Sequence, residues 1–252
     1  MRYTGRWVGG LVVGLLLTAA PAQAALILSG TIGAESFCAS DNGLGPCAFG
    51  TTVLVDTDPT IGRLAIDTTT LGGLTVSGSL HTITQGTHNV INSSSLQIVN
   101  DSGGTVSGQV AVGANGFIGP ITEASVSGAG TWETAEGSTI TQRWFNDPAN
   151  TQGALNPFAV QPGILLASNS DLAGPGTDAY SFSQNGIPVI DPALFGMTLQ
   201  FDFSLTDGGT LVGRSQTEIK DQALVPEPGS LALLGMGLFG VATKLRRRTH
   251  VL

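Results

Sequence analysis

The interior of the chain alternates short apolar and polar runs, separated by breaks rich in glycine, serine and threonine. In the clearest run, Leu199, Phe201 and Phe203 alternate with polar residues, which is the two-residue period of a strand with one buried face. Asp207-Gly208-Gly209 follows and predicts a turn into a second strand at 210–212. This region is therefore predicted to be a β-hairpin.

Further strand candidates recur along the chain, and no interior stretch shows a convincing helical period. They lie at 26–32, 51–55, 62–67, 73–84, 95–99, 104–113, 121–132, 139–145, 163–168 and 178–183. Strands of this length with turn residues between them are typical of an antiparallel β-sandwich or jelly roll. About 200 residues suit one such domain with a sizeable core.

Two features interrupt this pattern. Thr75-Val76-Ser77-Gly78 is echoed at 105–108 and 125–128, with starts separated by 30 and then 20 residues. The unequal spacing argues against a repeat fold such as a parallel β-helix, which is the alternative architecture. Residues 146–162 lack periodicity and contain three prolines, which predicts a long loop that is either a functional surface or slack.

The N-terminal segment is organised differently from the interior. Two arginines precede an apolar region at 7–20, and the small-x-small triplet Ala22-Gln23-Ala24 follows Pro21. This arrangement is typical of a secretory signal peptide cleaved after Ala24. An uncleaved anchor is the alternative, but a spanning helix needs roughly 20 apolar residues. We therefore assign 1–24 to a signal peptide and expect the secretion machinery as a partner.

The C-terminal segment carries three signals in a fixed order. Pro226, Glu227 and Pro228 come first, and an apolar run at 231–243 follows. A basic cluster then ends the pattern, made of Lys244, Arg246, Arg247 and Arg248. The apolar run would form a helix of about 20 Å against a hydrocarbon core of about 30 Å, so it predicts a marginal or temporary membrane span. The basic residues favour a cytoplasmic C-terminus.

This order resembles the PEP-CTERM sorting signal of exported proteins in Gram-negative bacteria, where a membrane-embedded exosortase processes the chain at the Pro-Glu-Pro motif. The resemblance covers 225–252 and implies exosortase as a partner, membrane anchoring through the C-terminus, and a final place in the cell envelope or extracellular matrix. Proteins with this tail are associated with exopolysaccharide and biofilm production. The resemblance therefore implies a structural or adhesive matrix role, with exopolysaccharide as a partner. A buried C-terminal helix is the alternative, but the run has no polar stripe.

Without the predicted signal peptide and sorting tail, the remaining chain is strongly acidic. Residues 25–224 contain four basic and 17 acidic side chains, a formal charge of −13. Phosphate binding needs clustered lysine and arginine, so nucleic acid is not expected as a partner. Adhesion to an anionic membrane surface is disfavoured for the same reason. Solubility outside the cell explains the charge, and cation binding is the sharper alternative.

The two cysteines, Cys38 and Cys47, frame a turn-rich interval that contains Asn42-Gly43 and Gly45-Pro46. An even cysteine count in an exported protein predicts one disulfide. A zinc site is the alternative, but it would need further cysteine or histidine nearby, and the closest histidine is His81.

Candidate catalytic groups are sparse, and we expect no enzyme. His81 and His88 are the only histidines in 25–224, and the chain lacks a Gly-x-Ser-x-Gly motif, so a hydrolase triad has no local support. Glu133 and Glu136 would serve as a glycosidase pair only at the required carboxylate separation. A secreted hydrolase would need a pocket that joins residues distant in sequence.

We expect no cofactor, and Ca²⁺ binding is the alternative. Asp56 and Asp58 supply the oxygen ligands that Ca²⁺ prefers, without the full spacing of an EF-hand loop.

Aromatic residues give the one positive indication of a binding site. Trp132, Trp144, Phe145 and Tyr180 lie in or beside strand candidates. If they are exposed, their rings would form a platform for sugars, and if they are buried they belong to the core. Trp132 and Trp144 are the candidate sugar contacts, and a carbohydrate-binding module is the first alternative function.

Overall fold

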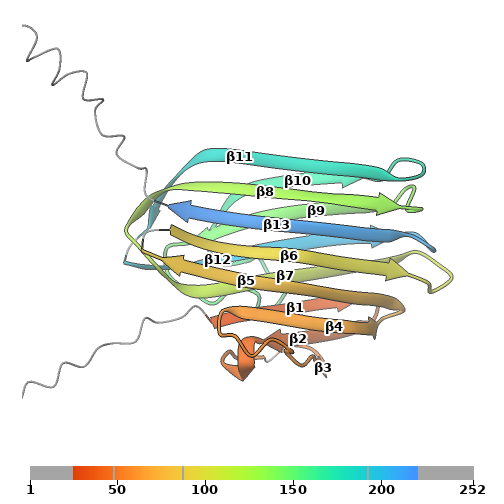
Figure 1. Cartoon of the computed structure of the whole chain (residues 1–252), viewed down its shortest axis with the longest axis horizontal. Helices are drawn as coiled ribbons and strands as arrows, with labels where there is room; N and C mark the ends of the chain where they lie inside the picture. Colours follow the sequence, from red (N-terminus) through yellow and green to blue (C-terminus); the bar gives the residue numbers. More distant parts are fainter. Residues whose placement is uncertain (1–24, 48, 87, 192, 221–252) are drawn as a thin grey trace, which may run out of the picture.

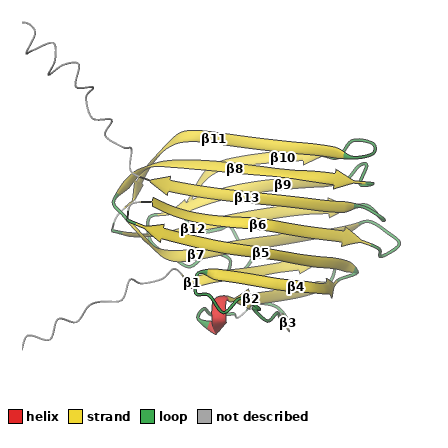
Figure 2. Cartoon of the chain, in the orientation of Figure 1, coloured by secondary structure: helices red, strands yellow, loops and turns green. Residues whose placement is uncertain are grey.

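The computed structural model describes residues 25–47, 49–86, 88–191 and 193–220. The predicted signal peptide and sorting tail lie outside these residues. The described chain forms two facing β-sheets and one short 3-10 turn at Asp41–Gly43 (Figures 1 and 2). The predicted antiparallel β-sandwich is confirmed.

The two sheets contain seven and six strands, and Figure 1 shows the six-stranded sheet in front of the seven-stranded one. The seven-stranded sheet has the order β10 (Ile164–Leu172), β9 (Thr139–Asp147), β12 (Leu194–Leu205), β7 (Val106–Ile118), β1 (Ala25–Ile32), β2 (Glu35–Ser40) and β3 (Thr52–Val53). The six-stranded sheet has the order β11 (Asp178–Asp191), β8 (Ile121–Glu133), β13 (Thr210–Lys220), β6 (His88–Asn100), β5 (Leu74–Gln85) and β4 (Arg63–Leu71). Neighbouring strands are antiparallel, except that β2 and β3 are parallel.

The core lies between the sheets and follows the alternation of the sequence. On β12, Leu199, Phe201 and Phe203 are buried and belong to the main hydrophobic cluster. Val126 of β8 and Leu211 of β13 join the same cluster from the facing sheet. Burial of alternate side chains from both sheets supplies the hydrophobic stabilisation of the sandwich.

Every strand candidate corresponds to a strand, and most of the observed strands are longer than predicted. The sequence pattern missed β2. Only Phe37 and Ala39 of this short strand enter the main core, and Cys38 faces the other way into a second cluster. Two inward residues are too few to produce a visible alternation.

The predicted hairpin at 206–209 is wrong, because β12 and β13 belong to different sheets. The connection instead crosses the sandwich. Asn100 at the end of β6 holds it in place, since its backbone N–H donates to the Gly209 carbonyl at 2.9 Å and its side chain donates to the Leu205 carbonyl at 2.7 Å. A turn that crosses between sheets has the same sequence pattern as a hairpin turn, and a partner far along the chain decides between them.

The long loop between β9 and β10, residues 148–163, lies across the outer face of the seven-stranded sheet, and we call it the strap. The Ser29 hydroxyl donates to the Ala154 carbonyl at 2.5 Å, and the Gln200 amide donates to the Pro157 carbonyl at 2.8 Å. A Cβ at Gly113 would lie 2.5 Å from the carbonyl carbon of Gly153, so only glycine allows this approach. The loop therefore covers a sheet and is held to it by hydrogen bonds and close packing.

The predicted disulfide is confirmed, because Cys38 and Cys47 are bonded. Cys38 is buried in a small cluster with Ile27, Ala111 and Ala154 of the strap. The disulfide therefore stabilises the side of the sandwich that the strap covers.

Candidate functional site

The two tryptophans proposed as sugar contacts are fully buried, each with 0% of its surface exposed. Trp132 donates from Nε1 to Oδ2 of Asp171 at 2.8 Å, and its ring lies 5.9 Å from that of Tyr180. Trp144 stacks on Phe182 at 5.3 Å. The predicted platform at Trp132 and Trp144 is therefore wrong. Few aromatic residues are available in this chain, and the core uses these two to fill the space between the sheets.

The other two aromatic candidates are buried as well. Phe145 is 7% exposed and Tyr180 is 6% exposed. Burial, followed by the nearby charge of Asp171, raises the pKa of the Tyr180 phenol. These rings belong to the structure of the sandwich and not to a surface site.

The carboxylates considered for Ca²⁺ bind backbone N–H groups. Oδ1 of Asp56 accepts from the N–H groups of Asp58 and Ala65, each at 3.0 Å, and Oδ1 of Asp58 accepts from Thr60 at 2.9 Å. Among the described residues, no group of three histidine, cysteine, aspartate or glutamate side chains is placed to hold a metal ion. Asp56 and Asp58 thus order the chain before β4, and the Ca²⁺ alternative is not supported.

Asp41 is a buried carboxylate that joins the two sheets at one edge. Its Oδ2 accepts from the Gly62 N–H at 2.5 Å, and its Oδ1 accepts from the Asn42 side chain at 2.8 Å. Burial raises the pKa of Asp41, and these two hydrogen bonds oppose the shift. The residue ties the end of β2 to the start of β4.

The two histidines lie on the outer face of the six-stranded sheet and do not form a catalytic pair. His81 of β5 is paired with Arg63 of β4, and burial, followed by the charge of Arg63, lowers the pKa of His81. The imidazole of His81 is therefore neutral at pH 7. His88 Nε2 lies 3.2 Å from Oε1 of Glu218.

The glutamates considered as a glycosidase pair lie at one tip of the sandwich. Glu133 ends β8 and Glu136 follows in the turn, and both are exposed. Neither residue lines any of the hollows described below. These hollows therefore offer no cleft in which the two carboxylates could flank a glycosidic bond.

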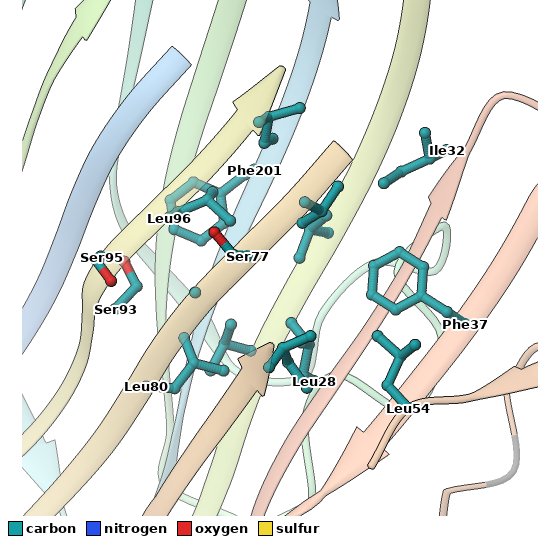
Figure 3. A pocket seen from close by; sticks show the side chains of 16 residues that line it. Leu28, Ile32, Phe37, Leu54, Ser77, Leu80, Ser93, Ser95, Leu96 and Phe201 are labelled. Atoms are coloured by element: carbon teal, nitrogen blue, oxygen red, sulfur yellow. The ribbon is translucent and has the colours of Figure 1, made fainter. Parts of the chain in front are cut away.

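The cavity between the sheets is too small for a ligand. Figure 3 shows its lining, in which Leu28, Phe37, Leu80 and Phe201 approach one another from both sheets. Its volume is about 30 Å³, which is room for about one water molecule. This cavity is a packing gap in the core.

A second hollow, of about 420 Å³, opens between β10 and β11, the strands at one edge of the two sheets. Its lining is mostly apolar and includes Ile164, Leu165 and Ile190, of which Ile190 is 90% exposed. It lacks the convergent polar groups that orient a small ligand.

The outer face of the six-stranded sheet is polar and carries no covering loop among the described residues. We call it the open face. One row of side chains crosses five neighbouring strands in register: His81, Asn92, Gln216, Ser127 and Ser183. Nδ2 of Asn92 donates to Oε1 of Gln216 at 3.0 Å. With strands about 4.8 Å apart, this row extends over about 19 Å.

Two hollows on the open face form a shallow groove. The larger, about 510 Å³, is lined by residues that include Asn92, Ser127 and Gln216. The smaller, about 290 Å³, lies beside it, and Ala129 and Arg214 line both. The groove exists because β8 and β11 present mainly short side chains there. Its size falls in the range of ligand sites in proteins.

Sequence reasoning missed the groove. The alternation at 121–132 marks one polar face of β8, and the residues after 212 do the same for β13. The sequence does not show that these two strands, about 90 residues apart in the sequence, are neighbours in one sheet. The sequence thus shows the polar face of each strand but does not show that the two strands pair.

Several solved structures are similar to parts of this chain. TmCBM61 in complex with β-1,4-galactotriose is 12% identical, with a TM-score of 0.26, and the match covers 55% of this chain and 86% of that one. A family 11 carbohydrate-binding module from Clostridium thermocellum is 10% identical, with a TM-score of 0.25 and coverage of 67% and 94%. A structure of infectious bursal disease virus, Gt strain, is 15% identical, with a TM-score of 0.26 and coverage of 90% and 73%. Similarity at this level carries no conclusion about a ligand.

The comparisons with sequences bear on the C-terminal segment. No curated protein is significantly similar to the chain. Within the described ranges, no helix is both long and apolar enough to cross a membrane, and the apolar run at 231–243 lies outside them. Residues 224–248 match the PEP-CTERM protein-sorting motif, which indicates an exported protein that exosortase recognises.

Proposed function

We propose that this exported protein is associated with the cell surface or the extracellular matrix and has a structural or adhesive role through binding exopolysaccharide. The groove on the open face is the contact surface. The observation that carries this proposal is the difference between the outer faces of the two sheets. The strap covers part of one face, while the other is hollowed and lined by hydroxyl and amide groups.

The chemistry of the groove suits sugar hydroxyls. Serine, asparagine and glutamine side chains donate and accept hydrogen bonds, and the Asn92–Gln216 pair is held in place on neighbouring strands. Each hydrogen bond contributes about 0.5–1.5 kcal/mol net, so one groove binds weakly. A polysaccharide offers many equivalent segments to many protein copies, and weak contacts of this kind add to strong retention in a matrix.

A carbohydrate-binding module would use the same groove, with glycan binding as its whole task. We favour the matrix role because the sorting motif supports delivery to the envelope.

In this proposal the protein is not an enzyme, and the membrane segment at 231–243 holds the chain only until exosortase acts at Pro226, Glu227 and Pro228. Changing these three residues to alanine is expected to leave an unprocessed, membrane-retained form in a host with exosortase, detected by fractionation and by mass spectrometry of the C-terminus.

A pair of double variants tests the groove. Asn92→Ala with Gln216→Ala removes a hydrogen-bonded polar pair from the groove, and we expect about a tenfold loss of affinity for exopolysaccharide purified from the producing strain. The control is Thr141→Ala with Ser170→Ala, which removes a hydrogen-bonded pair from the outer face of the other sheet. Co-sedimentation with the polymer measures both. Equal binding by the two variants would refute the groove as the contact surface.

A further inference from the structure

One basic side chain among the described residues differs from the others. Three of the four are matched with a carboxylate: Arg143 with Asp202, Lys220 with Glu218, and Arg63 with Asp58. In the part of the chain that the structure describes, Arg214 has no hydrogen bond, ion pair or carboxylate neighbour of this kind. In so acidic a protein, a guanidinium without a carboxylate partner stands out.

The position of Arg214 explains its isolation. It is exposed on β13, near the middle of the open face, and its cross-strand neighbour on β8 is Ala129. Glu218 lies four residues from Arg214 along β13, and Glu133 lies four residues from Ala129 along β8, so the backbone positions are about 13 Å or more from that of Arg214. Neither glutamate forms an ion pair with Arg214 in the described chain, and salt, with a Debye length of about 10 Å at 0.1 M, weakens their attraction further.

The groove places this cation where a chain-like ligand would contact it. Arg214 lines both hollows, so a ligand that fills the groove passes it with space on either side. A small inorganic anion would contact the guanidinium and leave the hollows empty. A polysaccharide would instead fill both with sugar units and place one unit over Arg214.

We infer that the groove prefers an acidic polysaccharide, with a uronic acid carboxylate on Arg214 and the neighbouring sugar hydroxyls on the serine, asparagine and glutamine side chains. This inference rests on the proposed function and names its ligand class. The planar guanidinium donates two parallel hydrogen bonds to a carboxylate, a geometry that lysine cannot reproduce. The acidic remainder of the surface repels a polyanion, so binding is confined to the groove.

The test compares charge variants on the same face, with the full-length protein from a secreting host and polygalacturonate as the probe. Arg214→Gln is expected to lower the affinity about tenfold. Arg214→Lys should lower it by an intermediate factor, because lysine keeps the charge but cannot donate two parallel hydrogen bonds to one carboxylate. The control is Lys220→Gln, which removes the same charge from the end of β13, outside the groove. It should bind within twofold of the wild type. Wild-type affinity in Arg214→Gln, or an equal loss in Lys220→Gln, would overturn the inference.

Two further arms separate the inference from the proposed function. A neutral galactan should bind the wild type and Arg214→Gln equally, because it has no carboxylate. Binding of galactan without binding of polygalacturonate would end the inference and leave the groove as a sugar site. If polygalacturonate, galactan and the native exopolysaccharide all fail to bind, the inference and the proposed function are both refuted. Free galacturonate should compete for the site better than sulfate or phosphate at equal ionic strength, and the reverse order would identify a general anion site instead.

Discussion

The outer faces of the two sheets show opposite uses of the same kinds of side chain. On the seven-stranded sheet, Thr198 and Gln200 point outward and yet are only 2% and 6% exposed, where the strap approaches them. On the six-stranded sheet, Asn92 and Gln216 also point outward and remain partly exposed. A polar outer residue therefore does not identify a solvent-facing surface, because a distant loop decides which polar groups remain available.

The covered face also illustrates how the open face can bind. The Gln200 amide holds the Pro157 carbonyl, and the Ser29 hydroxyl holds that of Ala154. Side-chain amides and hydroxyls on a pleated surface thus hold an irregular chain by hydrogen bonds. The groove offers the same groups to an external chain, such as a polysaccharide.

The largest expected effect comes from the disulfide beneath the covered face. Replacing both Cys38 and Cys47 with serine should lower the free energy of unfolding by about 2 to 3 kcal/mol, because the loop closed by the bond is short. The groove variant Asn92→Ala with Gln216→Ala should change it by only about 0.5 kcal/mol. Chemical denaturation measures both. Similar losses in the two variants would contradict a structural difference between the faces, and thiol labelling of the unreduced, unfolded wild type would contradict the bond.

The strap gives the next effect. Gly113→Ala would place a Cβ 2.5 Å from the backbone of Gly153, so the strap must shift, at a cost of about 1–3 kcal/mol. Gly104→Ala is the matched control, because nothing lies within 4 Å of its Cβ position. Thermal melts compare the two, and proteolysis within 148–163 should be faster in Gly113→Ala alone. Equal protease resistance would show that the strap does not depend on this contact.

These contacts mark the limit of prediction from the sequence. Alternation at Leu199, Phe201 and Phe203 correctly identified the buried face of β12, because a period of two reports local geometry. It did not identify the partner of β13, which Asn100 helps to fix from about 110 residues away. Pairings at such a distance in the sequence leave no local signal.

The candidate site was harder to predict than the fold. Trp132 and Trp144 stand in strands with the alternation of half-buried faces, and the pattern allows either face for a large ring. Their burial depends on the polar partners and rings that the other strands supply, such as Asp171 for Trp132. The groove is made of short polar side chains, which in a sequence look the same as any solvent-facing strand.

A pH-dependent effect tests the edge where the two sheets are joined. Burial raises the pKa of Asp41 above its ordinary value of 3.8, so this group contributes stability below that pH and loses it as the pH rises through the raised pKa. Asp41→Asn removes the charge but also turns one of the two accepting oxygens into a donor. Its stability relative to the wild type should therefore be lowest in acid and should improve as the pH rises through the raised pKa. Asp178 has the opposite sign, because the N–H groups of Gly174 and Ala179 lower its pKa. Asp178→Asn should be less stable than the wild type at pH 7, and this difference should disappear in acid. Melts from pH 3 to 8 would contradict this account if both variants behaved alike.

The smallest effect on stability, and the sharpest test of the open face, comes from removing the sorting tail. A sorting tail that occupied the groove would abolish the difference between the two faces. Deleting 225–252 should change the free energy of unfolding by less than about 0.5 kcal/mol, because the two sheets of the described chain are complete within residues 25–220. Binding of polygalacturonate should be unchanged, while fractionation should find the protein released instead of retained. Tighter binding after truncation would mean that the tail competes for the groove, and a misfolded product would mean that the apolar run belongs to the core. The first outcome would mean that the six-stranded sheet is covered by its own chain, as the seven-stranded sheet is by the strap.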